Sequence, residues 1–158
     1  MTKKILFIRH GKATQEFMPD MERFITEKGI KRTHKHTKKL KEKGIYPDLI
    51  ISSPAVRAQE TAQIIAQNFD YDIDKIEINE HLYFSSEQTI INIIRSLPNN
   101  ITTVFLVGHN NLWTDLADEF SSEDIWHLRT SGIFGVQFDT ENWAEILTAK
   151  KSDLVLIN

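Results

Sequence analysis

Three apolar segments of the chain each lead into residues that suit phosphate chemistry. The three junctions are Ile8-Arg9-His10-Gly11, Ile51-Ser52-Ser53-Pro54 with Arg57 one turn further on, and Val107-Gly108-His109-Asn110. A guanidinium group offers a planar fork of donors that matches phosphate oxygens, and a neutral imidazole can attack phosphorus and carry it as a covalent intermediate. Two arginines, one protonated histidine and one neutral histidine around a single anion therefore predict phosphoryl transfer.

These groups can meet only if the apolar segments are neighbouring strands that end at one edge of a sheet. In open α/β sheets, ligands collect outside the carboxyl ends of the strands. Strands are expected at residues 3–8, 48–52, 75–79 and 103–107, and helices at residues 27–43, 54–69, 87–97 and 110–120. This alternation predicts an α/β fold with a mostly parallel central sheet that carries helices on both faces.

The ends of the predicted elements are marked by particular residues. Thr26 is a candidate N-cap for the first helix, and Gly44 is its candidate stop. Residues 133–139 and 143–148 read as two strands of a C-terminal hairpin. The apolar residues 154–157 either pack back onto the sheet or form an interface, and the sequence does not decide between these two.

Length and composition limit the class of protein. A chain of 158 residues suits a single domain over residues 1–158. The formal charge of -3 gives no strong attraction to nucleic acid or to an anionic membrane. There is no cysteine, which excludes disulfides and thiolate metal sites. The first apolar run is too short for a signal peptide or a spanning helix, so a cytoplasmic protein is expected.

Taken in order, the three junctions resemble the motifs of the histidine phosphatase superfamily, also called the phosphoglycerate mutase-like family. The resemblance runs from about residue 4 to residue 138 and implies the three-layer sandwich of that family. It implies that His10 is the nucleophile that becomes phosphohistidine. Arg9, Arg57 and His109 would complete the phosphate pocket, and neither a metal nor a cofactor is expected.

Two further site residues rest on the resemblance alone. Glu80 stands where many members carry the acid that protonates the leaving group, and the alternative is an ordinary exposed carboxylate. Arg23 precedes a stretch that ends at Gly29, and it is similar to a phosphate-contacting arginine of small SixA-like phosphohistidine phosphatases. The alternative for Arg23 is a simple surface role.

The substrate class can be narrowed within the family. Lys12, Ala13 and Glu16 replace the acidic residue, the Ser or Thr and the Asn that usually follow Arg-His-Gly in mutase-like members. Only 22 residues separate Arg57 from Glu80, an interval in which larger members insert a capping subdomain. A SixA-like phosphatase with an open site, acting on phosphohistidine or another phosphoprotein side chain, is therefore expected.

Other interpretations remain open. The same chemistry would serve a small-molecule phosphomonoesterase, and a protein with an inactive pocket would be a phosphate-binding adaptor. A metal hydrolase is disfavoured because no carboxylate ligands stand near His10 and His109. The lysine-rich residues 28–43 are interpreted as a solvated helix face, with a docking surface for an acidic partner as the alternative. Nucleic acid is disfavoured as the partner, and the oligomeric state is not predicted.

Overall fold

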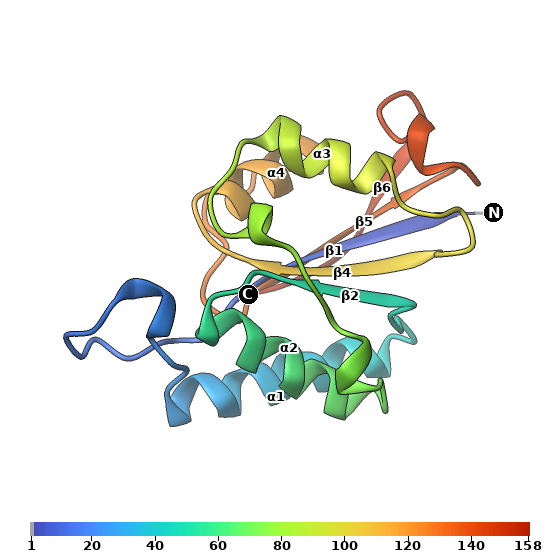
Figure 1. Ribbon diagram of the computed structural model, residues 1–158. Coiled ribbons are helices and arrows are strands. Elements are labelled where there is room, and N and C mark those ends of the chain that lie inside the picture. Colours follow the sequence, from blue (N-terminus) through green and yellow to red (C-terminus); the bar gives the residue numbers. More distant parts are fainter. Residues whose placement is uncertain (1) are drawn as a thin grey trace.

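The protein is a three-layer α/β sandwich built on one six-stranded sheet (Figure 1). The computed structural model describes residues 2–158. Helices cover both faces of the sheet (Figure 1). The α/β class and the helices on both faces agree with the prediction from sequence. Within residues 2–158, no helix is both long enough and apolar enough to cross a membrane.

The sheet is parallel in its first four strands and antiparallel at the C-terminal edge. The strands are β1 (Lys3–Arg9), β2 (Leu49–Ser52), β3 (Glu77–Ile78), β4 (Thr103–Gly108), β5 (Ile133–Phe138) and β6 (Lys151–Ile157), in the order β3-β2-β4-β1-β5-β6. Strands β1 and β2 both pair with β4 in parallel. The three strands that lead into the motifs are therefore adjacent, and their carboxyl ends share one edge.

The helices divide evenly between the two faces. α1 (Glu27–Glu42) and α2 (Val56–Asn68) lie on one face, and α3 (Glu87–Arg95) and α4 (Leu112–Phe120) lie on the other (Figure 1). Side chains alternate along each strand between the two layers. In β4, Phe105 and Val107 join the core under α1 and α2, whereas Val104 and Leu106 join the core under α3 and α4. Both faces are apolar, as a parallel sheet covered on both sides requires.

The predicted ends of the first helix are confirmed. The Thr26 hydroxyl accepts a hydrogen bond from the Gly29 amide at 3.1 Å, which caps α1. Gly44 follows the helix with a φ of +74°, a conformation that side chains with a Cβ rarely adopt. The loop after α1 then returns the chain to the sheet at β2.

The C-terminal hairpin exists, but its second strand is not at residues 143–148, where the sequence predicted it. Residues Trp143–Glu145 form a short 3₁₀ helix, which the Asn142 side chain caps by accepting from the Ala144 amide at 3.0 Å. The Trp143 indole is fully buried and donates to the Ile101 carbonyl at 2.8 Å. The strand is β6, which pairs with β5 at the edge of the sheet. Val155 and Ile157 join the core, whereas Leu156 is half exposed.

Candidate active site

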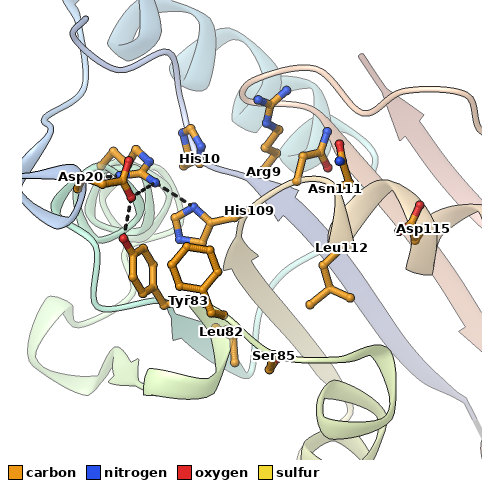
Figure 2. Close-up of a pocket in the computed structure, with 13 residues that line it drawn as sticks. Arg9, His10, Asp20, Leu82, Tyr83, Ser85, His109, Asn111, Leu112 and Asp115 are labelled. Carbon is orange, nitrogen blue, oxygen red and sulfur yellow. Dashed lines mark hydrogen bonds and ion pairs between the residues drawn. The ribbon is translucent and has the colours of Figure 1, made fainter. Parts of the chain in front are cut away.

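The three motifs meet at one edge of the sheet and surround one pocket. Arg9 of β1 pairs with Gly108 of β4, and the His10 amide donates to the Gly108 carbonyl at 3.0 Å. The imidazole rings of His10 and His109 lie 5.1 Å apart, centre to centre (Figure 2). The pocket has a volume of about 530 Å³. It is lined by Arg9, His10, Asp20, Arg57, Leu82, Tyr83, Phe84, Ser85, His109, Asn110, Asn111, Leu112 and Asp115.

His10 is held as a neutral imidazole with one nitrogen free to react. Its Nδ1 lies 2.7 Å from the Gly11 carbonyl, which accepts but cannot donate, so Nδ1 carries the proton. This leaves the lone pair on Nε2. Burial, reinforced by the neighbouring Arg57 and Arg9 charges, lowers the pKa of His10 to about 4. At neutral pH, His10 therefore has the protonation state of a nucleophile.

The backbone around His10 is fixed from both sides. The Gly11 amide donates to the Thr61 hydroxyl at 2.9 Å, and the Ser131 amide donates to the His10 carbonyl at 3.1 Å. Ser131 has a φ of +61°, and the buried His36 donates from Nδ1 to the Ser131 carbonyl at 2.6 Å. His36 thus supports the loop beside the nucleophile.

Without a bound anion, His109 is also neutral. Burial, reinforced by the nearby His10 and Arg57, lowers the pKa of His109 to about 3. Its Nδ1 accepts from Arg57 Nη2 at 3.4 Å, so its Nε2 donates to the Ser53 hydroxyl at 2.7 Å. Within the protein, positive charge in the pocket comes from the arginines. A bound dianion would act on His109 in the opposite direction and raise its pKa.

Asp20 joins the two sides of the pocket mouth. Its backbone carbonyl accepts from Arg57 Nη1 at 2.7 Å, and its carboxylate accepts from Arg57 Nη2 at 3.0 Å and from the Tyr83 hydroxyl at 2.5 Å (Figure 2). The hydrogen bond from Tyr83, with those from Arg57 and Arg23, lowers the pKa of Asp20 to about 2. Asp20 is therefore ionised at neutral pH and orients the Arg57 guanidinium.

The arginines keep donors that the protein does not use. Arg9 Nη1 donates to the Leu128 carbonyl at 3.1 Å, which anchors one end of its guanidinium. The Nε atoms of Arg9 and Arg57 are buried, and neither has a hydrogen-bond partner among residues 2–158. Buried donors without partners are costly. These features fit the binding of a phosphate group.

The structure does not bring the other two predicted site residues into the pocket. Glu80 lies in an exposed 3₁₀ turn, and the pocket is lined instead by residues that follow it, from Leu82 to Ser85. Arg23 does not line the pocket either. Its Nε donates to the Thr14 carbonyl at 2.9 Å and its Nη1 pairs with Asp20 at 3.1 Å. Arg23 therefore lies outside the pocket, where it pairs with the Asp20 carboxylate that also binds Arg57.

Several pocket residues were not predicted from the sequence. Asp20 and Tyr83 stand in irregular segments that gave no periodic signal. Ser53, which contacts His109 without lining the pocket, also had no predicted role. For Asn110, in the third motif, the sequence predicted no role either. Its side chain accepts from the Thr114 amide at 3.0 Å and donates to the Leu128 carbonyl at 2.8 Å, which fixes the start of α4 beside the pocket.

The motif glycines Gly11 and Gly108 are required by packing. A Cβ placed on Gly108 would lie 2.6 Å from Cζ2 of the fully buried Trp113. A Cβ on Gly11 would collide with the Ile25 side chain and lie 3.1 Å from the Thr33 hydroxyl. Both glycines therefore allow side chains of the core to pack beneath the catalytic loops.

Metal binding finds no candidate group in the part of the chain that the structure describes. Residues 2–158 contain no cluster of three His, Cys, Asp or Glu side chains placed to hold a metal ion. The pocket instead combines two guanidinium groups with two neutral imidazoles, a set that suits an oxyanion.

Comparison with known proteins gives one family. The family model described as "Histidine phosphatase superfamily (branch 1)" matches residues 5–120. The serine/threonine-protein phosphatase Pgam5, mitochondrial, of Drosophila ananassae is 38% identical over 74 residues, which are 47% of this chain and 26% of that protein. The chain thus spans about a quarter of the length of the curated relatives it matches.

Two solved structures share the fold over nearly the whole chain. A protein assigned as the phosphohistidine phosphatase SixA of Nakamurella multipartitia superimposes with a TM-score of 0.87 at 16% identity, covering 100% of this chain and 96% of that one. The protein histidine phosphatase SixA complexed with tungstate gives a TM-score of 0.82 at 20% identity, covering 98% of this chain and 96% of that one. At these identities the likeness concerns the fold.

Proposed function

Because the chain belongs to the histidine phosphatase superfamily, we propose that it is a phosphatase that works through a phosphohistidine on His10. The observation that carries the proposal is the fixed tautomer of this residue. Its Nδ1–H is engaged by the Gly11 carbonyl at 2.7 Å, its pKa is about 4, and it shares a pocket with two arginines. This is the arrangement that a neutral nitrogen nucleophile needs at physiological pH.

The proposed reaction has two displacements at phosphorus. The lone pair of His10 Nε2 attacks phosphorus in line with the leaving group, the bond from phosphorus to the leaving group breaks, and the leaving group takes its proton from solvent or from the pocket. Water then attacks phosphorus, the bond to Nε2 breaks, and the water proton passes to solvent. Inorganic phosphate and neutral His10 are regained.

Arg9, Arg57 and His109 have roles in binding and charge stabilisation in this scheme. The two guanidinium groups would bind the phosphoryl oxygens and stabilise the charge that they carry during transfer. His109 would donate to an oxygen once a dianion has raised its pKa. Arg23 would act through Asp20, which it pairs with at 3.1 Å.

Phosphohistidine, or another phosphoprotein side chain, is the proposed substrate class. Between α2 and α3 the chain forms only short 3₁₀ turns and the two-residue strand β3, so this interval contributes no capping subdomain. Phe84 lines the pocket with 78% of its surface exposed, which offers an apolar contact at the mouth. A small sugar phosphate would leave this mouth open, whereas a protein would cover it.

Leaving-group chemistry supports the same substrate class. An alkoxide leaves poorly unless an acid protonates it, and such an acid contributes about 10²–10⁴ in rate. Glu80 is outside the pocket, and Asp20 is held ionised with a pKa of about 2, so neither is placed to donate. An imidazole leaves more easily and needs this help less.

The substrate class is tested by the purified protein on a phosphohistidine protein, a phosphoserine protein and a set of sugar phosphates. The expected result is a higher kcat/KM for the phosphohistidine protein than for any sugar phosphate. A clear preference for the sugar phosphates would support the small-molecule phosphomonoesterase instead. His10→Ala should abolish turnover, and His127→Ala is the matched control because His127 is exposed and outside the pocket.

A pre-steady-state burst with an aryl phosphate separates an enzyme from an inactive adaptor. Binding of phosphate without any burst or turnover would favour the adaptor. The cytoplasmic location expected from the sequence stays a prediction.

A further inference from the structure

Helix α1 carries an uncompensated band of positive charge. Residues 28–41 contain seven lysines and arginines and no acidic residue. Because the whole chain has a formal charge of -3, the rest of the chain carries -10. The positive charge is therefore concentrated on one helix of an acidic protein. Five of these cations lie on one stripe of the helix and form what we call the basic band: Lys28, Lys31, Arg32, Lys35 and Lys39.

The basic band is concave and reaches the catalytic loop. Its five cations, with His36 and Asn158, line a groove of about 430 Å³. Lys28 and Arg32 also line a second hollow of about 370 Å³ together with Lys12, two residues after His10. The helix rises about 1.5 Å per residue, so the band extends about 16 Å along α1 from the edge of the sheet that bears the site.

The charges of the band are not neutralised within the protein. Among residues 2–158, the only ion pair formed by a band cation is Lys31 with Glu27, at a marginal 4.0 Å. Lys31 and Lys35 are four positions apart, as are Lys35 and Lys39, and like charges at this spacing destabilise a helix. The same field acts on the buried His36, whose pKa is lowered by burial and then by the cations around it.

We propose that the basic band docks an acidic segment of the phosphoprotein substrate while the phosphorylated side chain enters the pocket. That the partner is a phosphoprotein rests on the proposed function. That its docking segment is acidic rests only on the charge of the band. A carboxylate-rich peptide would relieve the repulsion along α1, and the continuity of the band with Lys12 would guide the segment toward His10. The charge of -10 elsewhere on the chain disfavours a long polyphosphate backbone, which would extend beyond the band.

Binding is tested first, without any catalytic step. A fluorescein-labelled octaglutamate peptide is titrated with the protein, and anisotropy is recorded at low and high salt. The band variant is Lys28→Gln/Arg32→Gln/Lys35→Gln. The matched control is Lys38→Gln/Lys43→Gln/Lys75→Gln, which changes the net charge equally at exposed lysines outside both hollows. Circular dichroism melts establish that both variants fold.

The expected result is a Kd about tenfold higher for the band variant, no such change for the control variant, and weaker binding in salt. Equal effects of the two variants, or no binding of the peptide, would overturn the proposal. So would tighter binding of a DNA oligonucleotide of equal charge, which would assign the band to nucleic acid. These outcomes do not depend on whether the protein is a phosphatase.

Kinetics then connect the band to the site. With a phosphohistidine protein that has an acidic surface, the band variant should raise KM about tenfold and leave kcat unchanged. With a small aryl phosphate, both parameters should stay as in the wild type. A loss of kcat on both substrates would show that the substitutions damage the site, and would overturn the docking role. Absence of turnover by the wild type would overturn the proposed function and leave the binding result standing.

Discussion

At acidic pH a buried imidazole stays neutral whereas an exposed one is protonated, and we expect His10 to stay neutral. An unperturbed histidine, with a pKa of about 6.5, is about 9% neutral at a pH of about 5.5. With the pKa of about 4 that burial gives it, His10 would be about 97% neutral at the same pH. The reactive form of the nucleophile should therefore persist well into the acidic range.

The assay is an NMR titration of isotope-labelled histidine side chains, with His10→Asn to identify the His10 signals. We expect a midpoint well below 6.5 and a neutral Nδ1–H tautomer above it. A midpoint between about 6 and 7, or an Nε2–H tautomer, would refute the argument that burial and the Gly11 carbonyl hold His10 ready to attack.

The same shift has a consequence for stability, and its sign is fixed. The folded state resists the proton that the unfolded state binds, so the free energy of unfolding falls as the pH falls from about 6.5 to about 4. A shift of this size corresponds to about 3 kcal/mol from His10, which is only 8% exposed. Urea unfolding of the wild type and His10→Asn should show a smaller loss for the variant over this range. Parallel curves would contradict the shift.

Three other substitutions probe the surroundings of the site. Asp20→Asn should lower the free energy of unfolding at neutral pH by at most about 1 kcal/mol, because Asp20 is partly exposed. In the wild type, this contribution of Asp20 should be lost only as the pH falls from about 3.8 to about 2, which unfolding curves at several pH values will show. Because Asp20 orients Arg57, the same variant should also raise KM. Glu80→Gln should leave kcat/KM on a phosphohistidine protein within about threefold, and a fall of about a hundredfold would show that Glu80 reaches the leaving group. Gly108→Ala should lower the free energy of unfolding by about 1–3 kcal/mol because its Cβ would meet the Trp113 ring, and unchanged denaturant midpoints would contradict that packing.

The sequence was sufficient to predict the meeting of the four central residues. Arg9, His10, Arg57 and His109 each follow an apolar strand, and parallel strands must end at one edge. Adjacency of β1, β4 and β2 then brings the motifs together. What could be predicted was thus the part that depends on local pattern and sheet geometry.

The features that could not be predicted from the sequence depend on tertiary contacts. Asp20 holds Arg57 across 37 positions, and nothing in its own irregular segment indicates that pairing. The neutral state of His109 in the absence of an anion follows from burial, which only the packed structure reveals. Tryptophan is common in strands. The Trp143 indole is instead buried and donates to the Ile101 carbonyl, and its segment forms a 3₁₀ turn.

The central claim is that phosphorus becomes bonded to His10. The most direct measurement is acid quenching during turnover with rapid neutralisation, followed by mass spectrometry of the peptide that contains residues 5–12. We predict an acid-labile phosphoryl group on His10 that appears together with the burst of leaving group, before inorganic phosphate, and is absent from His10→Ala. Turnover at the wild-type rate without that adduct, or a phosphoryl group on another residue that persists in His10→Ala, would contradict the account.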